Sequence, residues 1–157
     1  MCGISGFTHL NSTPVPGRLQ AAVASLTHRG PDQQGVFESA FVSLGATRLK
    51  IIDLASGDQP IVSEDGDRVI AFNGEIYNHA ELRAELEARG HRFRSRSDTE
   101  TVLAAFHEWD TDCFSRLRGM FAVALASHPV DTSSSGTRTY GEGRRTRQNQ
   151  PNSPKRW

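Results

Sequence analysis

The chain has 157 residues, enough for one domain with a hydrophobic core, and its 18 basic residues balance its 18 acidic ones. Residues 127–157 hold six basic residues against two acidic ones, so the first 126 residues carry a net charge of −4 and offer no basic surface for nucleic acid. No apolar run reaches transmembrane length and no signal-peptide pattern is present, so with only two cysteines we expect a cytoplasmic protein with free thiols.

The first half of the chain is dominated by short strand patterns. Residues 3–7 predict a strand whose glycines let another backbone come close. Apolar residues at helical spacing over 19–26 predict a helix that Gly30-Pro31 stops. Further β-like runs occupy residues 35–38, 41–47, 50–54, 59–62 and 68–72. Asp65-Gly66, between the last two runs, predicts a hairpin turn.

Helical patterns follow in the second half. Asn78 with Glu81 predicts a capping box for a helix that ends at Gly90, and Ser97 with Glu100 predicts a second helix start. A short helix over 112–117 and a buried strand over 120–126 complete the pattern. Strands and helices do not alternate strictly, which favours an α+β fold over a doubly wound sheet.

The composition changes after residue 126. Residues 127–157 are mainly Ser, Thr, Gly, Pro, Arg, Asn and Gln, and such a segment cannot bury enough apolar surface to offset its conformational entropy. We therefore expect a domain over residues 1–126 and a disordered polar, basic tail over 127–157. The basic residues of the tail are diffuse and not interleaved with aromatic ones, which argues against a nucleic-acid arm.

Cys2 is the first candidate for chemistry. If Met1 is removed, Cys2 carries a thiol beside a free α-amine, and N-terminal nucleophiles use that amine as a base. The alternative is that a cysteine stands at position two by chance. Cys113 lies in a partly apolar segment, where a packing role is expected instead.

Three other segments place polar residues in strand or helix-start context. Arg48 at a strand end could clamp a carboxylate, although such arginines are often solvated surface charges. Asn73-Gly74, where a strand is expected to leave the sheet, offers two adjacent donors for an oxyanion, but the pair is also the commonest turn sequence. Asp98 at a helix start could bind an ammonium group or simply cap the helix. Together these groups would suit an amino-acid amide.

Seven motifs, in order along the first 126 residues, resemble the glutaminase domain of glutamine-hydrolysing asparagine synthetases, a class II glutamine amidotransferase domain. They are Met1-Cys2-Gly3-Ile4, His28-Arg29-Gly30-Pro31-Asp32, Arg48-Leu49-Lys50-Ile51-Ile52-Asp53-Leu54, Gln59-Pro60, the run from Phe72 to His79, Ser97-Asp98-Thr99-Glu100 and Gly119-Met120-Phe121-Ala122. Other class II amidotransferases share the N-terminal cysteine and the Asn-Gly pair but not this set.

The resemblance implies a four-layer αββα sandwich of the N-terminal-nucleophile hydrolase type. In that interpretation Cys2 attacks the side-chain amide of glutamine to give a glutamyl thioester, and Asn73 and Gly74 stabilise the oxyanion. No metal ligand is implied in this domain, and the six histidines show no metal-ligand spacing.

The resemblance also implies how glutamine is held. Arg48 would bind the substrate α-carboxylate and Asp98 its α-ammonium group. Glu75, Ile51 and Ile52 would line the pocket. The segment His28-Arg29-Gly30-Pro31-Asp32 is expected to form a loop that shapes the site.

Members of the family pass ammonia to a second domain that uses ATP and magnesium to make asparagine from aspartate. Its Ser-Gly-Gly-x-Asp-Ser loop does not occur in this sequence, so we expect no asparagine synthesis by this chain alone. The match ends near Leu125, which predicts that the C-terminal strands of the sandwich are missing. The expected partners are glutamine and a separate synthetase domain or chain, and family members are often dimeric. Two alternatives stay open: a catalytically silent glutamine-binding or interaction fragment, and a chain that does not fold stably.

Overall fold

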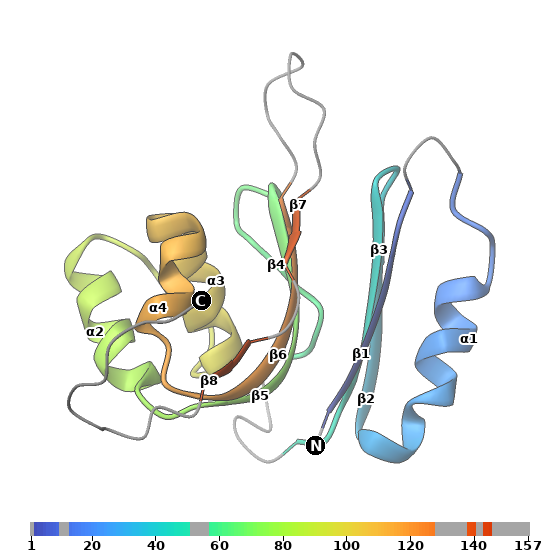
Figure 1. Cartoon of the computed structure of the whole chain (residues 1–157), viewed down its shortest axis with the longest axis horizontal. Helices are drawn as coiled ribbons and strands as arrows, with labels where there is room; N and C mark the ends of the chain where they lie inside the picture. Colours follow the sequence, from blue (N-terminus) through green and yellow to red (C-terminus); the bar gives the residue numbers. More distant parts are fainter. Residues whose placement is uncertain (1, 10–12, 51–56, 128–137, 141–142, 146–157) are drawn as a thin grey trace, which may run out of the picture.

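The computed structural model describes residues 2–9, 13–50, 57–127, 138–140 and 143–145. Two antiparallel sheets face each other, with one helix on the outer side of the first sheet and three helices on the outer side of the second (Figure 1). This layer order is the predicted αββα sandwich, and the α+β fold class is confirmed.

The first sheet contains β1 (Gly3–Thr8), β2 (Gln33–Glu38) and β3 (Val42–Arg48) in the order β1-β3-β2. Helix α1 (Arg18–Ser25) and the 3-10 turn η1 (Thr27–Arg29) cover its outer face. Helix α1 lies very close to β3 at Gly45. A Cβ at this glycine would be 2.3 Å from Val23 Cγ2, so a larger residue would not fit there. The predicted helix is confirmed and starts at Arg18, but α1 ends at Ser25, before the predicted stop at Gly30-Pro31, and η1 follows it.

The second sheet contains β4 (Ile61–Val62), β5 (Arg68–Ile76), β6 (Gly119–Ser127), β7 (Arg138–Tyr140) and β8 (Gly143–Arg145). Strand β5 pairs with β4 and β6, and both β7 and β8 pair with β6. The hairpin turn at Asp65-Gly66 is confirmed, with Gly66 at a φ of 77°. Strand β5 runs four residues beyond the predicted end at residue 72.

Helices α2 (His79–Ala88), α3 (Asp98–Trp109) and α4 (Cys113–Arg116), with the 3-10 turn η2 (Asp110–Asp112), cover the outer face of the second sheet. They bury the even-numbered side chains of β5 in the main core, which includes Ile70, Phe72 and Ile76. Because successive strand residues point to opposite faces, the odd-numbered residues of β5 face the first sheet.

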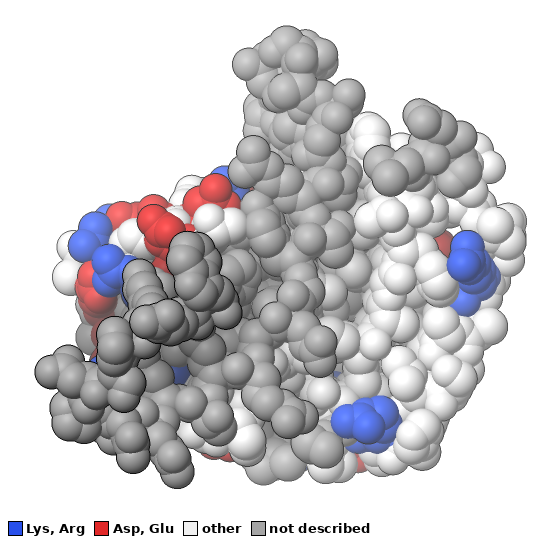
Figure 2. All heavy atoms as spheres, in the orientation of Figure 1, with Lys and Arg blue, Asp and Glu red and all other residues white. Residues whose placement is uncertain are grey.

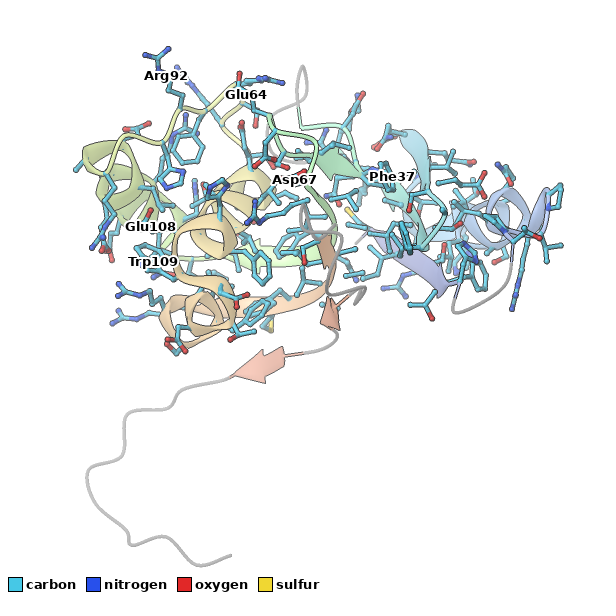
Figure 3. All side chains as sticks on the ribbon, turned by 90° about the horizontal axis from the view of Figure 1, so that it is seen from above. Phe37, Glu64, Asp67, Arg92, Glu108 and Trp109 are labelled. Atoms are coloured by element: carbon cyan, nitrogen blue, oxygen red, sulfur yellow. The ribbon has the colours of Figure 1, made fainter. Side chains whose placement is uncertain are left out.

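The space between the sheets is apolar at one end. There Val42 and Leu44 of β3 pack against Val69 of β5 and Ala126 of β6. Phe37 of β2 packs on the same cluster, and Figure 3 shows Phe37 on the first sheet and Asp67 in the β4–β5 turn of the second at this end. Polar residues of the inter-sheet face therefore occur toward the other end, where β3 reaches Arg48 and β5 reaches Asn73.

The two predicted capping boxes are wrong in part. Asn78 is the N-cap residue of α2, but its side chain binds the backbone of Arg116 and Arg118 in the segment after α4. Ser97 caps α3 by accepting a hydrogen bond from the Thr99 N–H, whereas Glu100 does not bond back to it. The Glu100 carboxylate accepts hydrogen bonds from the backbone N–H groups of residues 94 and 95, because the preceding loop folds over the helix start.

Some predictions about the tail and loops need correction or lie beyond the described residues. Residues 138–140 and 143–145, expected to be disordered, form strands because pairing with β6 supplies backbone hydrogen bonds whatever the side chains are. The strand predicted over 59–62 shortens to Ile61–Val62. The strand predicted over 50–54 lies almost wholly outside the described residues, as does most of the tail.

Charged side chains of the described residues alternate in sign over the layer of α2 and α3 (Figure 2). Arg89, for example, pairs with Glu85 at 3.2 Å and with Glu108 at 3.0 Å. Such exposed pairs contribute only about 0–1 kcal/mol each to stability. Because the signs alternate, this face has no strong electrostatic field of one sign. Within the part of the chain that the structure describes, no helix has the length and apolar character needed to cross a bilayer.

Candidate active site

Cys2 lies immediately before β1, at the polar end of the inter-sheet space, and is half-buried. Gly3 pairs with Thr47 across the sheet, and a Cβ at Gly3 would meet Thr47 Oγ1 on the α1 side. Strand alternation therefore puts Cys2, one residue earlier, on the opposite face, beside Arg48. The Arg29 Nε–H donates to the Cys2 carbonyl at 3.2 Å, so the expected loop of residues 28–32 does contact the cysteine.

Arg48 ends β3 and its side chain is only 7% exposed, so the alternative of a solvated surface charge is wrong. Its Nη1 lies 3.3 Å from Asp58 Oδ1, and Lys50 Nζ lies 3.1 Å from the same oxygen. The 28–32 loop also holds its backbone: Asp32 N–H donates to the Arg48 carbonyl at 3.1 Å. Gly30 lies so close that a Cβ there would be 2.5 Å from the Arg48 nitrogen.

Asn73 and Gly74 lie inside β5, opposite Ala122 and Phe121 of β6. The expectation that the strand leaves the sheet here, and the alternative of a plain turn, are both wrong. Pairing with β6 continues to Ile76 because a glycine at position 74, at a φ of 155°, allows β6 to come close. A Cβ at Gly74 would be 2.2 Å from the Met120 carbonyl oxygen. The Asn73 side chain is half-buried and, as an odd-numbered residue of β5, faces the first sheet.

Two backbone donors of β5 point away from β6, toward the edge that β4 leaves uncovered. Phe72 N–H donates to the Gln59 side-chain Oε1 at 2.6 Å, and Ile76 N–H donates to Asp98 Oδ2 at 3.1 Å. Because N–H groups of a strand alternate between its two edges, the Gly74 N–H points to this same edge, between the other two. The edge thus presents the Gly74 N–H next to the Asn73 side chain, the pair of donors predicted to stabilise an oxyanion.

Asp98 is the first residue of α3, and the alternative that it only caps the helix is wrong, since Ser97 fills that role. Burial raises the pKa of the Asp98 carboxyl, although hydrogen bonds from the Ile76 and Thr99 N–H groups act in the opposite direction. A buried carboxylate of this kind gains most from a nearby cation. Its position therefore suits a substrate ammonium group.

Gly57 connects Arg48 with the start of α3. Its φ is 79°, and a Cβ there would lie 3.2 Å from Arg48 Nη2 and 3.0 Å from Ser97 Cβ. The guanidinium of Arg48 and the residue preceding Asp98 therefore flank the same glycine. Asp98 is thus only one residue from a direct neighbour of the glycine that the Arg48 side chain approaches.

The remaining predicted pocket residues are partly placed. Glu75 is exposed on β5 opposite Met120, and its charge contributes to the raised pKa of Asp98, so the two carboxylates lie near each other. Ile51 and Ile52 lie outside the described residues.

Cys113 is fully buried in the core on the helix side of the second sheet. Desolvation, with help from the charges of Asp110 and Asp112, raises the pKa of its thiol to about 12. Cys113 is therefore protonated at neutral pH and is not a nucleophile, as expected.

Gln59 and Asp58 are site residues that the sequence reasoning missed. The motif Gln59-Pro60 was recognised only as part of a resemblance, and nothing local to it indicates a buried side chain. The one available signal is a glutamine next to a proline directly before an apolar strand, which is a weak pattern.

A cavity of about 620 Å³ lies next to the site, between α3, the β4–β5 turn and the loop between α2 and α3. Gly57 and Asp58 line one end, while His91 and His107 lie at another part of its wall. Glu64 and Arg92, labelled in Figure 3, also line it, from the turn and the loop respectively. Cys2 and Asn73 do not line this cavity, so the proposed nucleophile and oxyanion donor are positioned by the strands and not by this hollow.

Most of the chain matches a known protein family. The family model for the glutamine amidotransferase domain matches residues 1–134. Glutamine-hydrolyzing asparagine synthetase 1 of Bacillus subtilis is 50% identical over 100 residues, which cover 64% of this chain and 16% of that protein. Glutamine-hydrolyzing asparagine synthetase B of Escherichia coli is 40% identical over 133 residues, covering 83% of this chain and 24% of that protein.

The chain thus spans less than a quarter of the length of these curated relatives. Among solved structures, the glutamine phosphoribosylpyrophosphate amidotransferase of B. subtilis superposes with a TM-score of 0.46 at 23% identity, over 55% of this chain and 21% of that one.

Proposed function

The chain belongs to the glutamine amidotransferase domain family, and from that premise we propose that it hydrolyses the side-chain amide of glutamine through a thioester on Cys2. The observation that carries the proposal is the meeting of Arg48 and the start of α3 at Gly57, at the end of the sandwich where Cys2 lies. In this proposal Arg48 and the neighbouring Asp98 receive the carboxylate and ammonium groups of an amino acid, whose side chain then extends toward the cysteine.

Binding of glutamine uses opposite charges at its two backbone groups. The planar guanidinium of Arg48 receives the α-carboxylate, in competition with the exposed carboxylate of Asp58. Asp98 receives the α-ammonium group, and Glu75 lines the same part of the pocket. Ile51 and Ile52 stay predicted as further lining residues.

The first chemical step is attack by sulfur on the amide carbon. Once Met1 is removed, the α-amine of Cys2 takes the thiol proton as the C–S bond forms. The amide oxygen becomes an oxyanion, which the Asn73 side-chain amide and the Gly74 N–H stabilise. When the intermediate collapses, the C–N bond breaks, and the protonated α-amine returns its proton to the leaving nitrogen, giving ammonia and a glutamyl thioester.

The second step is hydrolysis of that thioester. Water attacks the thioester carbon while the α-amine accepts one of its protons, and the same two donors stabilise the second oxyanion. The C–S bond then breaks, the thiol is regenerated and glutamate leaves. Neither step needs a metal or a nucleotide.

We further propose that the ammonia serves asparagine synthesis from aspartate, as the names of the curated relatives suggest. That reaction would take place in a synthetase domain or chain that holds ATP and magnesium. Among the described residues, no group of three or more His, Cys, Asp and Glu side chains could hold a metal ion.

The direct test is incubation of the 157-residue chain with L-glutamine and measurement of glutamate and ammonia, after intact-mass analysis has shown loss of Met1. Equal amounts of the two products are expected. No release from folded, Met1-processed protein would retire the enzymatic proposal in favour of a silent glutamine-binding fragment. A melt without a cooperative transition would instead identify a chain that does not fold stably.

A further inference from the structure

We infer that Gln59 is a positioning residue for the oxyanion-binding edge of β5, an inference that rests on the proposed function. Gln59 lies in the segment before β4, far from Cys2 in sequence, and is only 5% exposed. It does not itself reach the reacting atoms in this proposal. Its role is to hold the backbone that does.

The side chain of Gln59 joins the second sheet to α3. Its Oε1 accepts the Phe72 N–H at 2.6 Å, and its Nε2 donates to Thr99 Oγ1 at 3.3 Å. Phe72 directly precedes Asn73, and Thr99 directly follows Asp98. One buried amide therefore contacts the neighbours of both the proposed oxyanion donor and the proposed ammonium-binding residue.

The backbone of Gln59 is fastened to the first sheet. The Gln33 side chain donates through Nε2 to the Gln59 carbonyl at 2.8 Å and accepts the Gln59 N–H through Oε1 at 3.3 Å. Gln33 pairs with Arg48 across β2 and β3. Strand β2 approaches so closely here that a Cβ at Gly35 would be 2.0 Å from the Gln59 carbonyl oxygen.

These contacts make Gln59 a tie between the two sheets at the level of the site. On the first sheet lie Arg48 and, beside it, Cys2; on the second lies the β5 edge with Gly74. The Phe72 and Ile76 N–H groups on that edge are bound by Gln59 and Asp98, and the Gly74 N–H lies between them. Without the Gln59 side chain the Phe72 N–H has lost its acceptor. The strand just before Gly74 is then no longer held at this edge, and the Gly74 N–H loses its fixed direction.

A positioning role of this kind affects the transition state more than substrate binding. An oxyanion forms only after attack, so its donors stabilise the transition state and not bound glutamine. Misdirected donors therefore lower kcat while KM changes little. A general loosening of the fold would disturb Arg48 and Asp98 as well and raise KM.

The test compares Gln59→Leu, Gln59→Glu and Thr99→Val in the full chain, with Gln34→Leu as the matched control. Gln34 is an exposed β2 residue whose side chain binds Thr27 Oγ1, away from the site. We expect Gln59→Leu to lower kcat on the order of 10-fold or more with KM within about twofold, as for loss of part of an oxyanion site. Thr99→Val, which removes only the contact with Nε2, should have a smaller effect of the same kind, and Gln34→Leu none.

Gln59→Glu adds a pH signature. A protonated glutamic acid can accept the Phe72 N–H and donate to Thr99 Oγ1 as glutamine does. The carboxylate instead adds a buried negative charge at this edge, which opposes formation of the oxyanion. The activity of this variant relative to wild type should therefore rise as the pH falls. If Gln59→Leu does not fold, the pH profile of Gln59→Glu and the kcat of Thr99→Val test the positioning role of Gln59.

Amide hydrogen exchange separates this inference from the proposed function. In Gln59→Leu, which removes the acceptor, the Phe72 amide should exchange faster than in wild type, while the Ile76 amide, bound by Asp98, stays protected. Wild-type protein that does not release ammonia would refute the proposed function only. Unchanged Phe72 exchange, or kcat values in the Gln59 variants equal to that of Gln34→Leu, would refute the role of Gln59.

Discussion

The Asp98 carboxylate accepts a hydrogen bond of 3.1 Å from the backbone N–H of Ile76. This contact joins the first residue of α3 to the last residue of β5, three residues after Asn73. It explains why an acidic side chain that a helix start would otherwise present to solvent is turned toward the strand that carries the proposed oxyanion donors. Several expected outcomes depend on this arrangement.

Replacement of the two cysteines should have opposite results. Cys2→Ala should lower ammonia release from glutamine by a factor on the order of 10³ or more, because no other group near the β1 start can form the thioester. Cys113→Ala should keep the activity and lower the free energy of unfolding by about 1 kcal/mol, since it removes one buried sulfur. Ammonia release and urea unfolding of both variants check this. Residual turnover in Cys2→Ala that matches wild type would exclude Cys2 as the nucleophile.

Asp98→Asn should raise KM for glutamine on the order of 30-fold, because an amide keeps an acceptor for the Ile76 N–H but loses the charge, and an unpaired buried charge partner costs about 2–5 kcal/mol. The matched measurement uses glutaramate, which has the carboxamide but no α-ammonium group. Wild type should prefer glutamine strongly over glutaramate, and Asp98→Asn should show little preference. An unchanged preference would assign the ammonium group to another residue.

The raised pKa of Asp98 predicts a pH dependence of stability. The folded state holds the Asp98 proton to higher pH than the unfolded state, whose carboxyl titrates near the ordinary value of 3.8. The contribution of Asp98 to the free energy of unfolding is therefore fully present below pH 3.8 and is lost as the pH rises through the raised pKa of the folded state.

Asp98→Asn lacks this titration. Its free energy of unfolding relative to wild type should increase between acidic pH and neutrality, as urea unfolding at a series of pH values would show. A difference between the two proteins that does not change with pH would contradict the shift.

Gly74→Ala should destabilise the fold and abolish glutamine hydrolysis. The added Cβ would be 2.2 Å from the Met120 carbonyl oxygen, so β6 would have to move away, and we expect a loss of about 2 kcal/mol or more in the free energy of unfolding.

Gly66→Ala is the matched control for this substitution. Gly66 has a φ of 77°, and an added Cβ there would meet no atom within 4 Å, so only backbone strain of about 1 kcal/mol is expected, with activity retained. Equal losses of stability in the two variants would show that conformation, and not contact with β6, restricts position 74.

Local patterns in the sequence predicted most of the secondary structure. The β1 strand, the α1 helix and the hairpin at Asp65-Gly66 depend on residues that are neighbours in the chain, and all three are confirmed. Asn73-Gly74 misled the prediction for the same reason: by local propensity it is a turn, and only pairing with β6, about fifty residues later, keeps it in a strand.

Asp98 shows the same limit at the level of one side chain. The Ser97–Glu100 pattern indicates Ser97 as the cap of α3, but nothing nearby in sequence indicates what the Asp98 carboxylate binds. The hydrogen bond that turns Asp98 toward the site comes from Ile76, which is 22 residues away.

The amino-acid order alone specified the chemical groups of the site and their family, because a cysteine after Met1, an Asn-Gly pair, an arginine and an aspartate are the same functional groups wherever the fold puts them. Tertiary structure alone decided which way those groups point and what holds them. The deciding hydrogen bonds of Gln59 join residues 13, 26 and 40 positions apart, and partners at such separations meet only after the two sheets and α3 have packed together.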